Sequence, residues 1–120
     1  MRDLFLRIST ELAAHEAAEN DVVFPAARAG VPSGRRDIHE LTEEHEEVNS
    51  LLTEMLTLDP SSAGFITRAS ALVFELRAHF AEEEEILFPA LRAVLDPAAL
   101  EELGLRVRAA KRTAPIFPVP

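Results

Sequence analysis

Leu12-Ala-Ala-His15-Glu-Ala-Ala-Glu19, followed by Phe24-Pro25, occurs twice in this chain. The second copy begins 64 positions later as Leu76-Arg-Ala-His79-Phe-Ala-Glu-Glu83, followed by Phe88-Pro89. On an α-helix, residues four positions apart project from the same face, one turn from each other. Each copy therefore presents an imidazole and a carboxylate together, and we interpret the two copies as the halves of one metal site.

The two copies agree well beyond their His and Glu residues. When residues 11–28 are aligned with residues 75–92, ten of the eighteen positions are identical, and His, Glu, Phe, Pro and Arg are all in register. A lone histidine in a helical seam is more often a hydrogen-bonded core residue than a ligand. Independent core histidines, however, have no reason to recur together with their Glu partners, so the duplication favours metal ligation.

The composition narrows the class of protein. The chain has 120 residues, of which 48% are hydrophobic, which suits one domain with a single core. Cysteine is absent, so disulfides, thiolate metal sites and Cys nucleophiles are excluded. The formal charge of −9 argues against a nucleic-acid partner and favours cations. No apolar run resembles a signal peptide or a membrane span, so we expect a cytoplasmic protein that does not enter the membrane.

Helical periodicity predicts an all-α fold. Three long helices are expected over roughly residues 3–29, 37–58 and 63–95, and a shorter one over residues 98–111. Asp37 is the predicted N-cap of the second helix, with Glu40 three residues further on, as in a capping box. We divide the chain into a helical domain, residues 1–112, and a Pro-rich tail, residues 113–120.

Each long helix carries an apolar seam that is interrupted near its middle by polar residues. Pro25 and Pro89 lie inside the helical pattern and predict a kink in the first and third helices. Buried imidazoles and carboxylates are usually hydrogen-bonded, paired or bound to metal. The three predicted seams are Leu4, Ile8, Leu12, His15, Glu19, Val22 and Ala26; Ile38, Leu41, His45, Val48, Leu52 and Met55; and Leu72, Leu76, His79, Glu83, Ile86 and Ala90.

The predicted ligands supply three imidazoles and two carboxylates: His15, Glu19, His45, His79 and Glu83. Nitrogen and oxygen donors without a thiolate suit Fe, Mn or Zn. Inward-facing Glu and His residues in helical bundles commonly hold two iron or two manganese ions. A carboxylate that bridges two ions is the natural role for the two Glu residues.

Neighbouring polar residues offer alternatives. Glu82 is three residues from His79, but the repeat aligns Glu83, not Glu82, with a Glu, so Glu83 is the preferred ligand. Glu16, next to His15, is a candidate extra ligand. His39 falls off the seam of its helix, and we expect it to be solvated.

These motifs resemble the hemerythrin-like HHE cation-binding family. The resemblance covers nearly the whole chain: H-x-x-x-E before F-P in the first helix, Glu43-Glu44-His45 in the second, H-F-x-x-E-E before L-F-P in the third, and the tail segment Ala110-Lys-Arg-Thr-Ala-Pro115. It implies an up-down four-helix bundle with a non-haem di-iron centre, and a role in binding O₂ or another diatomic gas, in handling iron, or in redox sensing.

The chain departs from the family pattern at its start. In the family, an additional first helix with a histidine precedes the segment that corresponds to residues 15–19, and Met1 begins after it. The natural protein could be longer, a second subunit could supply the missing donor, or the site could hold one ion or none stably. Monomeric proteins seldom expose a large apolar groove. We therefore expect a homodimer that covers this seam.

Three functions remain open from the sequence. The leading one is a di-iron or incomplete di-iron protein that binds or senses O₂ or related oxidants, or that handles iron. The second is an enzyme on the same site, an oxidase or a peroxide-disproportionating catalyst. The third is a non-catalytic helical interaction module whose site has decayed. The sequence favours a carrier or sensor over an enzyme, because it indicates no organic substrate and no separate acid or base.

Overall fold

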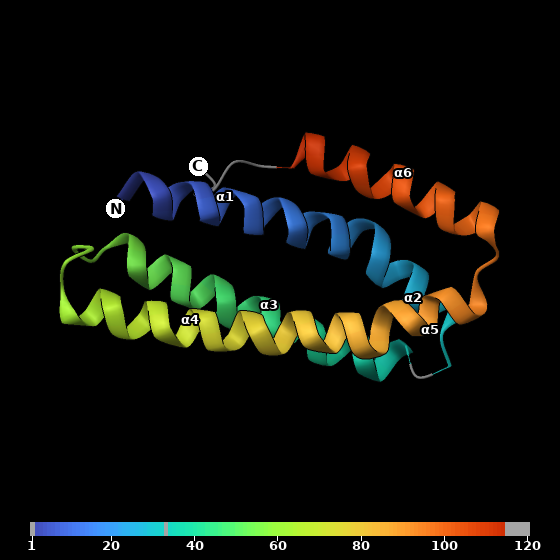
Figure 1. The fold of residues 1–120 in the computed structure, drawn as a ribbon, viewed down its shortest axis with the longest axis horizontal. Helices are drawn as coiled ribbons and strands as arrows, with labels where there is room; N and C mark the ends of the chain where they lie inside the picture. Colours follow the sequence, from blue (N-terminus) through green and yellow to red (C-terminus); the bar gives the residue numbers. More distant parts are fainter. Residues whose placement is uncertain (1, 33, 115–120) are drawn as a thin grey trace.

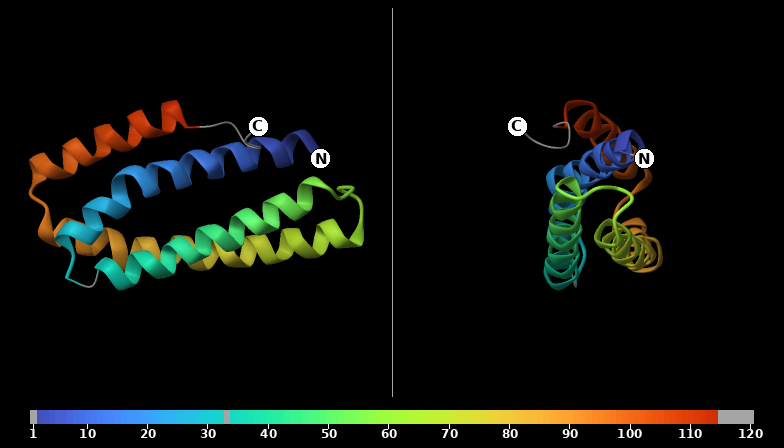
Figure 2. Two further views of the ribbon diagram at one scale, coloured as in Figure 1. Left: turned by 180° about the vertical axis from the view of Figure 1, so that it is seen from behind. Right: turned by 90° about the vertical axis from the view of Figure 1, so that its left-hand side faces the viewer.

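Three long helical arms and one further helix make up the fold, which confirms the all-α prediction (Figure 1). A computed structural model describes residues 2–32 and 34–114. The first arm is α1 (Arg2–Ala18), η1 (Glu19–Val23) and α2 (Phe24–Gly30), and the second is α3 (Gly34–Leu56). The third is α4 (Ala63–Glu82), η2 (Glu83–Leu87) and α5 (Phe88–Val94), after which α6 (Pro97–Thr113) turns back along α1. In end-on view, α3 and α4 lie below α1 and α6 (Figure 2).

The helix boundaries follow local capping chemistry, with one correction. The Ser62 side chain accepts a hydrogen bond from the Phe65 amide at 3.1 Å, and Asp96 accepts one from the Ala99 amide at 2.8 Å. The predicted N-cap at Asp37 is wrong, because α3 already begins at Gly34, whose amide donates to the Val31 carbonyl. Asp37 instead lies in the first helical turn, where a carboxylate is favoured by the helix dipole.

The last helix is longer than expected. It covers 17 residues and continues to Thr113, one residue past the predicted end of the domain. Of the Pro-rich tail, residues 115–120 lie outside the described residues. The division at residue 112 therefore stays a prediction.

The kinks predicted at Pro25 and Pro89 occur as π turns directly before the Phe-Pro pairs. The Phe24 amide donates to the Glu19 carbonyl, and the Phe88 amide donates to the Glu83 carbonyl, five residues back in both cases. Proline has no amide hydrogen and collides with the carbonyl four residues before it, so a regular α-helix is disfavoured at these positions. The first arm bends visibly between α1 and α2 (Figure 1).

The seam of α3 is confirmed, since all six of its predicted residues are buried. The third arm needs a correction, because Ile86 is 53% exposed and Leu87 is buried. The extra residue in a π turn shifts the register after Glu83 by one position. The sequence pattern assumed a regular helix and therefore selected the wrong neighbour.

The seam of α1 is also shifted from the prediction. Leu4 and Ile8 are exposed, whereas Phe5 and Ser9 are buried. Phe5 packs edge-on against Phe65, with ring centroids 5.5 Å apart. The Ser9 hydroxyl donates to the Phe5 carbonyl at 2.8 Å, so a polar residue can be buried there without an unpaired group.

Two apolar clusters form the core and leave a polar centre between them. On α3, Leu41 belongs to one cluster and Val48 to the other, and the buried His45 lies between them. The clusters are Val23, Phe24, Ala27, Val31, Ile38, Leu41, Leu87 and Leu91, and Phe5, Val48, Leu52, Met55, Phe65 and Leu72. Among the described residues, no helix is long and apolar enough to cross a membrane.

Candidate metal centre

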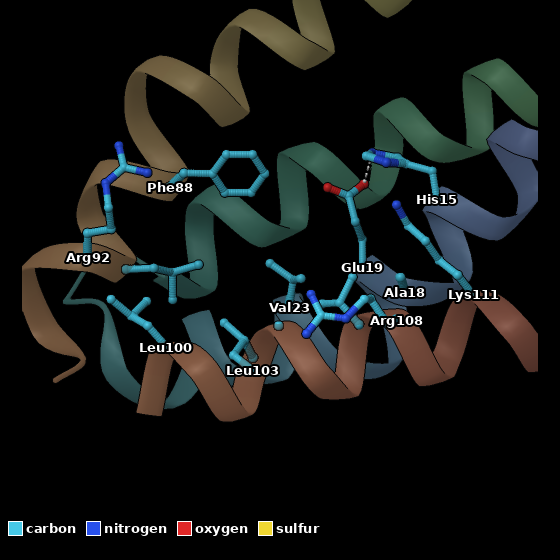
Figure 3. A pocket seen from close by; sticks show the side chains of 13 residues that line it. His15, Ala18, Glu19, Val23, Phe88, Arg92, Leu100, Leu103, Arg108 and Lys111 are labelled. Atoms are coloured by element: carbon cyan, nitrogen blue, oxygen red, sulfur yellow. Dashed lines mark ion pairs between the residues drawn. The ribbon is translucent and has the colours of Figure 1, made fainter. Parts of the chain in front are cut away.

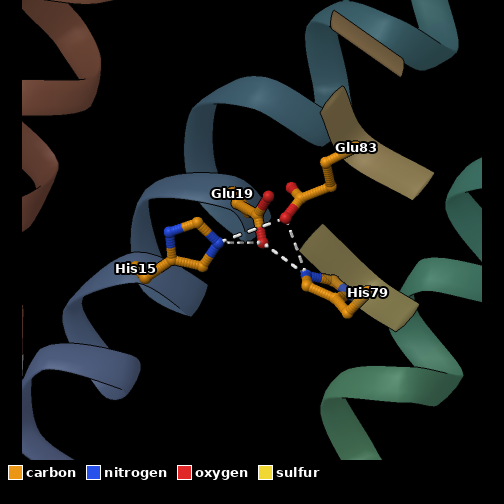
Figure 4. Close-up of side chains that lie close together, drawn as sticks. All are labelled: His15, Glu19, His79 and Glu83. Atoms are coloured by element: carbon orange, nitrogen blue, oxygen red, sulfur yellow. Dashed lines mark hydrogen bonds and ion pairs between the residues drawn. The ribbon is translucent and has the colours of Figure 1, made fainter. Parts of the chain in front are cut away.

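The two halves of the sequence repeat meet in the middle of the bundle (Figure 4). His15 projects from α1 and His79 from α4, while Glu19 and Glu83 are the first residues of η1 and η2. Each of the four offers one ligand atom, and these atoms all lie within 4.8 Å of one another. The π turn thus begins at the ligand candidate in both arms, so the repeat duplicates backbone geometry as well as side chains.

The carboxylate oxygens and the imidazole Nε2 atoms are interleaved. Glu19 Oε1 lies 3.0 Å from His15 Nε2 and 3.2 Å from His79 Nε2. Glu83 Oε1 lies 3.3 Å from His15 Nε2 and 2.9 Å from His79 Nε2. Each carboxylate therefore contacts both histidines, one on its own arm and one on the opposite arm.

His45 joins the cluster through Glu19. Its Nε2 lies 2.8 Å from Glu19 Oε1, and its ring lies 4.9 Å from the His79 ring, measured between centroids. Phe24 stacks on the His45 ring, with the ring centroids 5.2 Å apart. The structure thus brings all five predicted site residues together.

The burial of the cluster leaves polar atoms without partners. Glu19, Glu83, His45 and His79 are all buried, and the His15 side chain is 29% exposed. Glu19 Oε2 and Glu83 Oε2 are buried and have no hydrogen-bond partner among the described residues. An unpaired buried carboxylate oxygen is costly. A cation between these oxygens and the imidazoles satisfies them, so the donor set fits a metal.

Hydrogen bonds and charges within the cluster shift the pKa values of Glu19 and His79 in the direction opposite to burial. Burial raises the pKa of Glu19, but hydrogen bonds from the imidazoles of His15, His45 and His79 outweigh it and hold that pKa well below its usual range. Burial likewise lowers the pKa of His79, but Glu19 and Glu44 outweigh it and raise that pKa. Hydrogen bonds from the imidazoles thus stabilise the charged form of Glu19 in the absence of a metal.

Glu44 is a functional residue that sequence reasoning missed. Its Oε2 lies 2.7 Å from His79 Nδ1. A carboxylate that accepts a hydrogen bond from Nδ1–H fixes the orientation of the ring and leaves Nε2 facing the centre. Glu44 was visible only as part of a Glu43-Glu44-His45 motif, because its contact with His79 arises from the packing of α3 against α4.

Other polar residues fall outside the cluster. Glu16 lies beside it and borders a cavity of about 10 Å³ together with the three histidines. Its Oε1 is buried and has no hydrogen-bond partner within residues 2–32 and 34–114. Burial raises the Glu16 pKa although the histidines and Asn49 oppose it. His39 is exposed and pairs with Glu43 on the surface at 2.9 Å, which confirms the solvated interpretation. Of Glu82 and Glu83, only Glu83, the ligand preferred from the repeat, joins the described cluster; that it binds a metal stays a prediction.

Comparisons with known proteins agree with this geometry. A family model described as the hemerythrin HHE cation binding domain matches residues 1–91. A curated protein from Nostoc sp. named DNA nickase is 32% identical over 111 residues, which cover 92% of this chain and 31% of that protein. The chain thus spans about a third of the relative's length, and no solved structure matches it. Its duplicated His-x-x-x-Glu motif, assembled in a helical bundle, fits a cation site, and the chain belongs to the hemerythrin HHE cation-binding domain family.

Proposed function

We propose that this chain binds non-haem iron and uses it to bind or sense O₂ or a related small oxidant. The observation that carries this proposal is the pair of buried carboxylates. Each has Oε1 against two or more imidazoles, and each has Oε2 buried with no partner in the part of the chain that the structure describes. Nitrogen and oxygen donors of this kind suit iron, with manganese and zinc as alternatives.

The ligand count favours an open site. His15, His45 and His79 would each give Nε2, and Glu19 and Glu83 would give carboxylate oxygens, for one ion or for two bridged ions. With one oxygen from each carboxylate, five donors leave at least one position free even on a single six-coordinate ion. Bound iron supplies one-electron redox chemistry toward O₂ and peroxides. The protein supplies apolar walls, with Phe24 stacked on His45 and Phe80 edge-on to His15 at 5.4 Å, and these limit the access of water.

Anaerobic loading with Fe(II) followed by air tests the proposal. The wild-type protein should retain iron and develop an optical absorption band on exposure to O₂, and removal of O₂ should reverse the band if the protein is a carrier. Glu83→Ala should abolish both iron retention and the band, whereas Glu84→Ala, in the same acidic run but exposed, should change neither. An absence of iron from the loaded wild-type protein contradicts the proposal.

The enzyme alternative has its own outcome in the same experiment. Peroxide turnover that is lost in Glu83→Ala, without a reversible response to O₂, assigns the site to an enzyme. The sequence indicates no organic substrate for such an enzyme. The carrier or sensor function is therefore the one we propose first.

The similarity to a protein named DNA nickase raises the question of whether this chain acts on DNA. We propose that the shared segment is a metal-binding part and that this chain alone does not nick DNA, since its formal charge is −9 and DNA phosphates require Lys and Arg. Supercoiled plasmid incubated with iron- or manganese-loaded protein should stay supercoiled. Nicked circles that disappear in Glu83→Ala would overturn this.

We further propose a homodimer through the open side of the bundle. On α4, Ile66, Val73 and Phe80 recur at seven-residue spacing and are 57%, 48% and 36% exposed. Phe80 contacts the ring of His15, which shares its face of α1 with the exposed Ile8. The stripe therefore reaches the metal centre, where a second copy can shield it. Light scattering should show a dimer that Val73→Glu dissociates; a compact wild-type monomer at micromolar concentration contradicts it.

A further inference from the structure

A second concave site adjoins the metal centre. A cavity of about 490 Å³ lies between α1, α5 and α6 (Figure 3). Its walls are apolar, with Val23, Phe88 and Leu91 from the first and third arms and Leu100, Leu103 and Val107 from α6. Its volume falls within the range of small-molecule sites, which are typically apolar with a few placed polar groups.

The packing of α6 leaves this space open. None of the residues of α6 is buried, although Leu100, Leu103 and Val107 face the arms and are half-buried. Protein interiors are normally packed as densely as organic crystals. A helix that spans an apolar cavity without closing it leaves room for a ligand that completes the packing.

Three cationic side chains border the cavity. They are Arg92 on α5 and Arg108 and Lys111 on α6, and none of them forms an ion pair within residues 2–32 and 34–114. Arg108 and Lys111 lie at the end of the cavity next to Glu19 and His15, while Arg92 lies at the opposite end (Figure 3). Glu19 itself is already engaged by three imidazoles.

The rim of this cavity combines cations with a large apolar wall. The protein has 12 Lys and Arg against 21 Asp and Glu, and yet the rim of this cavity carries three cations and one compensated carboxylate. Unpaired cations beside an apolar wall attract an anion, and guanidinium groups bind carboxylates through directed hydrogen bonds. A neutral apolar ligand would leave these groups unused.

We propose that the cavity binds an organic anion with an apolar body, of the class of a medium-chain carboxylate. Its carboxylate lies against Arg108 and Lys111, and its chain runs along Phe88 and Leu103 beneath α6. The head group is thereby placed beside His15 and Glu19, at the edge of the metal centre. Arg108, Lys111 and the apolar walls are not among the proposed metal ligands, although the cavity also borders His15 and Glu19.

Calorimetric titration with decanoate tests the proposal, with 1-decanol as the neutral probe of matching length. Wild-type protein should bind decanoate at one site, and decanol should bind about tenfold or more weakly, because it lacks the charge. The double variant Arg108→Gln/Lys111→Gln should weaken decanoate binding by a similar factor. The control Arg106→Gln/Arg112→Gln removes the same charge from exposed α6 residues that do not line the cavity, and it should bind within about twofold of wild type.

A cavity-filling variant tests the location. A Cβ atom at Gly104, which lines the cavity, meets only Arg108 Nη1 at 3.9 Å, so Gly104→Leu has space to enter. This variant should lose decanoate binding while its melting temperature stays the same or rises, since Leu favours helix more than Gly does. The proposal is overturned if wild type does not bind decanoate, if decanol binds equally well, if the outer-face control weakens binding as much, or if Gly104→Leu binds normally.

The titrations are run on metal-free and iron-loaded protein. Binding in both forms supports the cavity and is independent of the iron result. Decanoate binding by a protein that retains no iron would leave the cavity proposal intact and contradict only the proposed function. Iron retention without decanoate binding would contradict the cavity proposal and leave the proposed iron function intact.

Discussion

His79 is held through both of its ring nitrogens. Its Nε2 faces Glu19 and Glu83, and its Nδ1 lies 2.7 Å from Glu44 Oε2. We expect Glu44→Gln to weaken the binding of Fe(II) or Zn²⁺ by about 10- to 100-fold, because the ring loses the carboxylate that fixes its orientation and raises its basicity. Competition with a chromophoric chelator measures the affinity.

Glu43→Gln is the matched control for this change. Glu43 precedes Glu44 on α3 but pairs with His39 on the surface, where such pairs contribute little. It should leave metal affinity unchanged. Equal losses in the two variants would show that bulk charge matters and that the contact with His79 does not.

Glu82 gives the metal-free protein a characteristic pH dependence. Burial and the nearby carboxylates of Glu44 and Glu40 raise its pKa from 4.5 to about 7. The folded state therefore binds the Glu82 proton more tightly than the unfolded state does. The resulting contribution to the free energy of unfolding is complete below pH 4.5 and is lost as the pH rises through about 7. The raised pKa of His79 acts in the same direction above its ordinary value of 6.5. The depressed pKa of Glu19 makes a contribution that stays constant over this range.

The melting temperature of the metal-free protein should therefore fall between about pH 5 and pH 8. Glu82→Gln should flatten this fall, because an amide keeps the neutral form at every pH. Glu84→Gln, at an exposed neighbouring position, should keep the wild-type slope. A melting temperature that rises across this range, or an identical slope in Glu82→Gln, contradicts the assignment.

At the scale of single elements, the approach of α2 and α3 depends on one glycine. A Cβ atom built at Gly34 would lie 2.2 Å from the carbonyl oxygen of Ala27, which is backbone and cannot rotate away. Gly34→Ala should therefore destabilise the protein by about 2 kcal/mol or more. Gly64→Ala, at the start of α4, meets only side chains at 3.4 Å and beyond and should be neutral or slightly stabilising. Chemical denaturation measures both, and equal effects would refute the close approach at Gly34.

The elements also show which features a sequence can reveal. The seam of α3 was predicted completely because α3 is a regular helix with one buried face. The register of the third arm after Glu83 was predicted wrongly, because a π turn inserts one residue and brings Leu87 inward in place of Ile86. The prolines indicated a local distortion but not its form, since a kink and a π turn have the same sequence signal.

The candidate site was predictable for a different reason. Duplication of the His-x-x-x-Glu motif separated ligand candidates from ordinary core histidines, and it selected Glu83 over Glu82. Glu44 and the cavity under α6 could not be found in this way. Both depend on how separate helices pack, on α3 against α4 for Glu44 and on α6 across α1 and α5 for the cavity, and a single sequence carries no periodic signal for such contacts.

At the scale of the whole molecule, we expect metal binding to stabilise the fold. The centre joins all three arms, because its five residues come from α1, η1, α3, α4 and η2. A ligand that binds only the native state stabilises it by about 2.7 kcal/mol at a free concentration of 100 times its Kd. Addition of Fe(II) or Zn²⁺ should raise the melting temperature of wild type, and a chelator should reverse the rise. His79→Ala should melt at the same temperature with and without metal. If the site has decayed, the melting temperature of wild type should also be the same with and without metal.

The most direct test of the account is the iron content of the purified protein after anaerobic loading with Fe(II) and removal of unbound metal. Elemental analysis should give one or two iron ions per wild-type chain, and Glu83→Ala should retain almost none. Wild-type protein that holds no stoichiometric iron, manganese or zinc after loading would contradict the conclusion that the two halves of the repeat form one metal centre.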